Sequence, residues 1–171
     1  EALYNELMLP SLKTIISMEL TGMPMKAEQV AAVKAGLERE RDTHLKVITQ
    51  SPLIKMMNLL VQQSEMVKAN AKLKVKQHPI EHFADVQFNP NSGPQLQRLL
   101  YEQMGLPVLD YTDTKQPATG ADTIEKLINH TQEPAYKELL GALIEYGKVG
   151  KILSTFIPAF EAGIKKADGI L

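Results

Sequence analysis

Apolar residues recur at three- and four-residue steps through most of this chain, and this spacing is the strongest limit on its fold. It is the repeat of an α-helix that buries one stripe of its surface. The segments that carry it are residues 9–21, about 27–49, about 53–68, 92–104, 119–128 and from 134 to about 157. No segment with the alternating pattern of a β-strand competes with it. We predict an all-α, or nearly all-α, fold with long amphipathic helices and a small loop-rich tip.

Residues that start and stop helices support these bounds. Residues 51–52, Ser-Pro, combine a capping residue with a proline at the first helical position. Ser92 and Gln95 have the spacing of a capping box. Thr119 is expected to cap the next helix, and Pro158 is expected to end or kink the last one.

Composition excludes several kinds of site. The chain has no cysteine, so disulfides and thiolate metal sites are unavailable. Neither of the two common glycine-rich phosphate-binding motifs occurs. Among the histidines, only His78 and His82 have helical ligand spacing, and the intervening Pro79 favours a surface loop over a metal site. We therefore expect no metal or cofactor in this chain.

No apolar run approaches the roughly 20 residues of a membrane-spanning helix, and the first residues lack the basic start of a signal peptide. We expect a soluble, cytoplasmic protein without a membrane partner.

The net charge of −1 gives no general attraction to nucleic acid. The charge is nevertheless unevenly distributed, because four lysines and no acid lie between residues 68 and 76. They are Lys68, Lys72, Lys74 and Lys76. These lysines are candidates for contact with DNA or with a protein partner.

The last predicted helix carries a strip of very small side chains. Gly147, Gly150 and Ser154 follow one another at three- and four-residue steps. The residues that border this strip are Lys148, Lys151 and Thr155. Such a strip lets another backbone approach, and the bordering groups can meet phosphate oxygens. It could equally pack against another helix.

Two junctions between a loop and a helix, at residues 89–92 and 118–120, offer unpaired backbone N–H groups at the positive end of a helix dipole. Ordinary capping explains either junction taken alone. Two such junctions together with a lysine-bearing helix favour binding to phosphates.

The order of these motifs resembles the thumb of family A DNA polymerases. The matching segments are FNPNSGPQL at 88–96, GLP at 105–107, PATGADTIEKL at 117–127, KILSTFI at 151–157 and LPSLKTIISMELTGMPM at 9–25. Residues 168–171 look like the start of the palm of that family.

The resemblance implies a region, spanning residues 1–171, that binds primer–template duplex DNA through phosphates and the minor groove during replication or repair. Carried over position by position, the DNA contacts are Asn91, Ser92, Thr119, Lys151, Ser154 and Thr155. Lys148, beside the glycine strip, completes the predicted set. The chain departs from the family at Gly120, Leu153 and Phe156, where a serine, a basic residue and an aromatic hydroxyl are common.

The resemblance also implies that catalysis lies elsewhere. The palm that holds Mg²⁺ and the fingers that handle the nucleotide would follow Leu171. This chain is then not an enzyme by itself, although its parent resembles a DNA-directed DNA polymerase, a nucleotidyltransferase.

Residues 51–85 are not covered by the resemblance and read as an insertion. Weak periodicity predicts a loop over residues 69–87. The alternative function is a protein-interaction module in which this insertion docks a processivity protein. We favour packing of residues 53–67 on the core of the chain itself, which leaves the lysine run as an electropositive surface.

Overall fold

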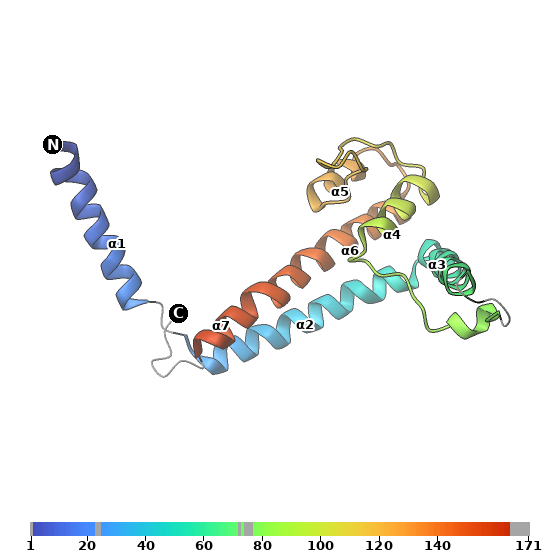
Figure 1. Ribbon diagram of the computed structural model, residues 1–171, viewed down its shortest axis with the longest axis horizontal. Helices are drawn as coiled ribbons and strands as arrows, with labels where there is room; N and C mark the ends of the chain where they lie inside the picture. The colour runs from blue at the N-terminus through green and yellow to red at the C-terminus, as the bar shows by residue number, and fades with distance from the viewer. Residues whose placement is uncertain (1, 23–24, 72, 74–76, 165–171) are drawn as a thin grey trace. The chain divides into compact units, whose positions relative to one another are not determined.

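The computed structural model describes residues 2–22, 25–71, 73 and 77–164. The elements are η1 (Leu3–Met8), α1 (Leu9–Thr21), α2 (Ala27–Gln50), α3 (Pro52–Asn70), η2 (Ile80–Phe83), α4 (Gly93–Gln97), η3 (Arg98–Gln103), α5 (Ala121–Ile128), α6 (Pro134–Lys151), η4 (Ile152–Phe156) and α7 (Ile157–Ile164) (Figure 1). Within the described residues the only β-pairing is an isolated bridge between Tyr111 and Pro117. The all-α prediction is confirmed.

The chain divides into two compact units. The first consists of Glu1–Glu38 with Lys151–Leu171, and the second consists of Arg39–Gly150. Helix α2 therefore begins in the first unit and ends in the second, and α6 belongs to the second unit up to Gly150.

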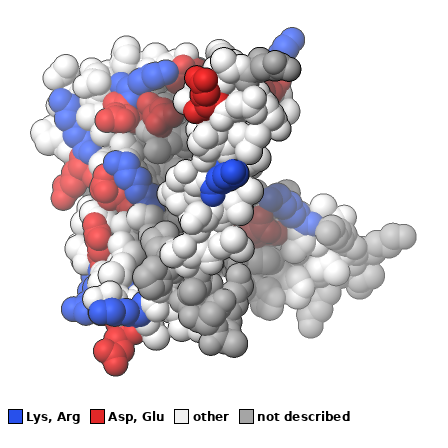
Figure 2. Space-filling model, turned by 90° about the vertical axis from the view of Figure 1, so that its left-hand side faces the viewer, with Lys and Arg blue, Asp and Glu red and all other residues white. Residues whose placement is uncertain are grey.

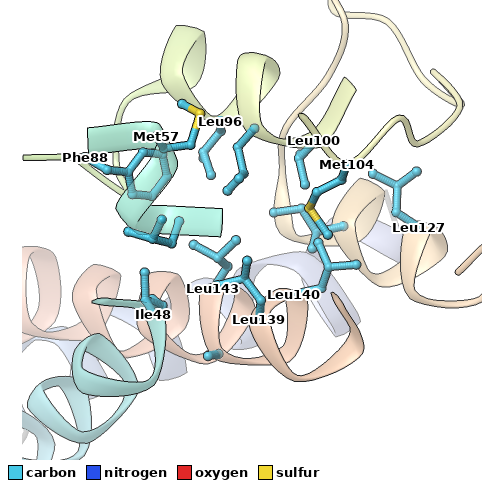
Figure 3. Packing of buried hydrophobic residues seen from close by; sticks show 14 of the residues in the cluster. Ile48, Met57, Phe88, Leu96, Leu100, Met104, Leu127, Leu139, Leu140 and Leu143 are labelled. Atoms are coloured by element: carbon cyan, nitrogen blue, oxygen red, sulfur yellow. The ribbon is translucent and has the colours of Figure 1, made fainter. Parts of the chain in front are cut away.

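The second unit has a single apolar core, which Figure 3 shows from close by. The end of α2 and helices α3, α4, η3, α5 and α6 all contribute to it. Its fully buried side chains are Ile48, Ile54, Met57, Leu99, Leu100, Leu127, Leu139 and Leu140. Burying one such side chain stabilises the fold by roughly 1.5–3 kcal/mol, so this cluster is the main source of stability in the unit.

Glycines in left-handed conformation end two helices where the sequence predicts. Gly22 (φ 64°) follows α1, and its N–H donates to the carbonyl of Met18 over 2.9 Å. Gly105 (φ 64°) follows η3, and the Leu106 N–H donates to the carbonyl of Leu100 over 3.0 Å. Only glycine adopts this backbone conformation without steric cost.

Helix α3 packs its inner face into the core, as self-packing of residues 53–67 predicts. Ile54, Met57 and Val61 are buried and belong to the core cluster. Met56 is not buried, since 40% of its surface is exposed.

The chain that returns from α3 is fastened to that helix by amide side chains. Asn70 accepts from the His78 N–H (2.8 Å) and donates to the His78 carbonyl (3.0 Å). Further along, Gln62 donates to the carbonyls of Ala84 (3.2 Å) and Val86 (3.1 Å). These bonds order a segment whose sequence lacks helical periodicity.

The segment 69–87, predicted to be a loop, contains helical structure at two places. Helix α3 continues to Asn70, and η2 forms a short 3₁₀ turn within the return. The rings of His78 and His82 stack with centroids 4.5 Å apart. Lys72, Lys74 and Lys76 lie outside the described residues.

In the first unit, α2 and α7 bury Val30 and Ile157. Lys34 of α2 also donates to Glu161 of α7 over 2.8 Å, and this ion pair is partly exposed. Helix α1 buries none of its own residues within the described chain. Val33, which the sequence places on the buried stripe of α2, is exposed.

The sequence also predicts burial of Ile152 and Phe156, and this is wrong. Both side chains are exposed, and Ile157 is buried instead. The shift of burial from Phe156 to Ile157 is caused by the π-helical turn η4, in which the Ile157 N–H donates to the carbonyl of Ile152, five residues back. A π-turn inserts one extra residue and so moves the buried position one residue along the chain.

Pro158 neither ends nor disrupts the helical run, contrary to expectation. It is the second residue of α7, where the absence of a backbone N–H is tolerated. Pro10 occupies the same place in α1, directly after the π-turn η1. In both cases an α-helix with proline at its second position follows a π-turn directly.

Met57→Ala should lower the free energy of unfolding by about 2–5 kcal/mol, because it removes a fully buried side chain from the core. The matched control is Met56→Ala, one residue away on the exposed face, which should change stability by about 0.5 kcal/mol or less. Urea unfolding of the two variants measures the difference. Equal losses would contradict the placement of α3.

Candidate nucleic-acid interface

The first loop-to-helix junction is built around Asn89. The Asn89 side chain accepts from the Asn91 N–H (2.9 Å), and the Asn89 carbonyl accepts from the Ser92 N–H (3.0 Å). Ser92 is the N-cap of α4 but makes no side-chain cap bond. The predicted capping box is wrong, because Gln95 Oε1 accepts from the Asn89 N–H (2.7 Å) instead. Within the described chain, the side chains of Asn91 and Ser92 have no hydrogen-bond partner.

The second junction starts α5 one residue later than predicted. The N-cap is Gly120, and its carbonyl accepts from the Ile124 N–H over 3.0 Å. Thr119 precedes the cap and is half-buried. Asp122 lies in the first turn, as predicted. The Thr119 hydroxyl does not cap α5 and has no hydrogen-bond partner among the residues described.

The loop that leads into this junction is tied down at its base. The Asp110 carboxylate accepts from Thr123 (3.0 Å) and from Lys126 (2.9 Å), both on α5. The Asp110 carbonyl accepts from the Ala118 N–H over 2.9 Å. The hydrogen bond from Lys126, and then that from Thr123, lowers the pKa of Asp110. The charged carboxylate is thus the form that fastens the loop.

Two side chains from the preceding helical run hold the other end of the loop. Gln97 Nε2 donates to the Pro117 carbonyl over 2.7 Å, and the Tyr101 hydroxyl donates to the Ala118 carbonyl. The sequence does not mark Gln97, Tyr101 and Asp110 as residues of the site. Their partners lie 13 to 20 residues away, so no local motif marks these contacts.

The structure brings the two junctions together in the second unit. Thr119 Oγ1 lies 4.0 Å from the point that a Cβ atom on Gly93 would occupy. A hollow of about 130 Å³ joins both junctions to α6; it is lined by Pro90, Leu96, Thr119, Ala121, Ile124, Leu143, Ile144 and Gly147. Two predicted phosphate-binding junctions and one glycine of the predicted strip therefore share a small surface.

The glycine strip is open. A Cβ atom built on Gly147 or on Gly150 would meet nothing within 4 Å among the described residues. No described residue of the second unit therefore packs closely on these two glycines. The space over the strip is free for another molecule.

The predicted cationic residues differ in their surroundings. Lys148 donates to Glu145 over 2.8 Å, and this bond, together with the charge of Glu145, raises the pKa of Lys148. Lys151 is exposed and has no ion-pair partner within the described residues. Of the two lysines, Lys151 is thus the one whose charge is not already paired.

Lys151, Ser154 and Thr155 belong to the first unit, and all three are exposed. Ser154 Oγ donates to the Lys151 carbonyl over a long 3.4 Å. The Thr155 hydroxyl has no hydrogen-bond partner in the described part of the chain. The structure leaves these polar groups open to solvent.

Charge on the rest of the surface is mixed. Of the lysines in the predicted run, Lys68 is described, and it pairs with Glu65 over 2.8 Å. On the face drawn in Figure 2, Lys and Arg side chains alternate with Asp and Glu, and no large surface of one sign forms. In the described segments, no cluster of three or more His, Cys, Asp or Glu side chains could hold a metal ion. None of the described helices is long and apolar enough to cross a membrane.

Comparison of this sequence with known protein families identifies the family to which the chain belongs. The sequence model of "DNA polymerase family A" matches residues 57–171, which is more than half of the chain. The matched range includes most of the segment 51–85 that the sequence analysis treats as an insertion.

Individual relatives agree with this match. The chain is 37% identical to the DNA polymerase I of Bacillus subtilis over 87 residues, 51% of this chain and 9% of that protein. It is 38% identical to the DNA polymerase of Escherichia phage T5 over 109 residues, 61% of this chain and 12% of that protein. It is 26% identical to the DNA polymerase I of Pseudomonas aeruginosa over 130 residues, 70% of this chain and 14% of that protein. The chain thus spans a small fraction of the length of these relatives.

Replacing Asp110 by Asn should reveal a pH-dependent contribution to stability. Since folding lowers the pKa of Asp110, its contribution is present above the unfolded value, about 3.9, and is lost as the pH falls through the lower folded value. The stability difference between the native chain and D110N should therefore shrink as the pH falls from 6 towards 2.5. Urea unfolding across this range measures it. D113N, an exposed aspartate of the same loop, is the control and should follow the native curve; a constant gap for D110N would refute the role of the carboxylate.

Proposed function

Because the chain belongs to DNA polymerase family A, we propose that it is the thumb region of such a polymerase and holds primer–template duplex DNA. The observation that carries this proposal is the meeting of both loop-to-helix junctions with Gly147 around one hollow. Two segments that resemble the family's DNA-binding motifs are thereby close together, and the side chains of Asn91, Ser92 and Thr119 in them have no hydrogen-bond partner among the described residues.

The chemistry of these groups suits a sugar–phosphate backbone. Asn91, Ser92 and Thr119 offer polar side chains that bond to none of the described residues. The open glycines of α6 permit close approach of another backbone. Lys151, which has no ion-pair partner in the described segments, adds a positive charge, and Ser154 and Thr155 add hydroxyl groups. Contacts of this kind fix the position of a duplex without reading its sequence.

We further propose that polymerisation takes place on other parts of the polymerase. Two-metal nucleotidyl transfer needs carboxylates that hold two metal ions about 3.5–4 Å apart. On this proposal the palm supplies those carboxylates and binds Mg²⁺, while the present chain contributes grip on the product duplex. The activity and partners of the whole polymerase are thus part of the proposal.

Lys151→Ala should weaken duplex binding and should lower the slope of log K against log salt by about 0.9, the value for one lost phosphate contact. Fluorescence anisotropy with a labelled primer–template duplex at several salt concentrations gives the slope. Lys137→Ala is the matched control, since Lys137 is an exposed lysine at the other end of α6. A K151A slope equal to that of the native chain would remove Lys151 from the interface.

Gly147→Ala should separate stability from binding. With open space at the Cβ position, alanine should raise the free energy of unfolding by up to about 1 kcal/mol, because it is the better helix former. The added methyl group should nevertheless weaken duplex binding if DNA approaches this strip. Gly141→Ala, at another open position of α6, should give the gain in stability without the loss of affinity. Equal duplex affinity of G147A and G141A would contradict the proposed contact.

A further inference from the structure

We infer that Gln97 and Tyr101 are positioning residues that set the DNA contact of Thr119, an inference that rests on the proposed function. Neither side chain is among the predicted DNA contacts. Both reach the short stretch of backbone from which Thr119 projects.

Gln97 and Tyr101 donate hydrogen bonds to two consecutive backbone carbonyls. Gln97 Nε2 donates to the carbonyl of Pro117 (2.7 Å), and the Tyr101 hydroxyl donates to the carbonyl of Ala118. These are the two residues directly before Thr119. Since the Ala118 N–H donates to Asp110 (2.9 Å), the peptide groups that lead into Thr119 are fixed from both sides of the chain.

Of the two donors, Tyr101 is itself held in place by the core. Tyr101 is half-buried and packs against the core cluster of the second unit. Burial first, and then the negative charge of Asp110, raises the pKa of Tyr101. The phenol therefore keeps its proton at neutral pH and remains a donor to the carbonyl.

Thr119 depends on these neighbours for its position. Its own hydroxyl has no partner within the described residues and does not cap α5. Beside it lies Gly93, and the Thr119 hydroxyl oxygen is 4.0 Å from the position that a Cβ atom on Gly93 would occupy. Without the two donors the stretch gains conformational freedom, and a ligand must then restrict that freedom when it binds.

The alternative is that both residues only stabilise the fold. A purely structural role would lower the stability of the chain, and any effect on affinity would be independent of Thr119. A positioning role predicts instead that the effect on affinity disappears when the Thr119 hydroxyl is absent. A double-mutant cycle separates the two roles.

The experiment compares duplex affinity for Y101F, T119A and the double variant at low salt. Y101F removes one hydroxyl and retains the ring, so the core stays filled. We expect Y101F and T119A each to weaken binding about three- to fivefold, as for one hydrogen bond, and the double variant to match T119A alone. Additive losses, or native affinity for Y101F, would overturn the inference. Y111F removes a hydroxyl from the same loop that bonds to no described residue, and it should bind as the native chain does.

Gln97→Met provides a second, independent cycle with Thr119, because methionine has a similar length but no donor. The same coupling is expected, and its absence in both cycles would refute the inference. If K151A and T119A weaken binding while Y101F and Q97M do not, the inference fails and the proposed function stands. If K151A weakens binding but T119A does not, the inference again fails. If neither K151A nor T119A has an effect, the proposed function fails as well.

Discussion

The burial of one face of α6 is the interaction on which the second unit depends. Leu139, Leu140 and Leu143 place that face in the core, where the end of α2 and helices α3, η3 and α5 meet it. The same burial fixes which residues of α6 are left at the surface. Gly147 is open and exposed as a consequence, at the rim of the hollow that the two loop-to-helix junctions share. Core and candidate interface are therefore two results of one helix orientation.

The sequence predicts the helices well because apolar spacing is a local property. The ends of α1 and α2 and the start of α6 fall close to their predicted positions, since glycine and proline lie beside them. The π-turns were not predicted, because a bond from residue i+5 to residue i leaves no repeating pattern in the sequence. That gap explains the error at Phe156: one extra residue in η4 passes the buried position to Ile157.

The candidate site was predicted only in part. The residues that were predicted carry local signals, and those that were not predicted contact partners far away in the sequence. Junction residues such as Ser92 and Thr119 carry local signals, although their capping bonds differ from the prediction because Gln95 bonds to Asn89 and Gly120 becomes the cap. Contacts between Gln97 or Tyr101 and the loop before Thr119 span 20 and 17 residues. Contacts of that range depend on the packing of the chain, which a local sequence motif does not encode.

A chain of net charge −1 can hold DNA only through local arrangement. Counterion release gives affinity in proportion to the number of phosphates that cations meet. Lys148 is already paired with Glu145, whereas Lys151 pairs with no acid among the residues that the structure describes. On the proposed function, a larger share of the affinity for DNA must then come from hydroxyl groups, amides and the close approach that glycine allows. Such contacts are short-ranged and require that the loops be held rigidly, since a displacement of an ångström breaks a hydrogen bond. The ties from Asp110, Gln97 and Tyr101 supply that rigidity where electrostatic attraction is weak.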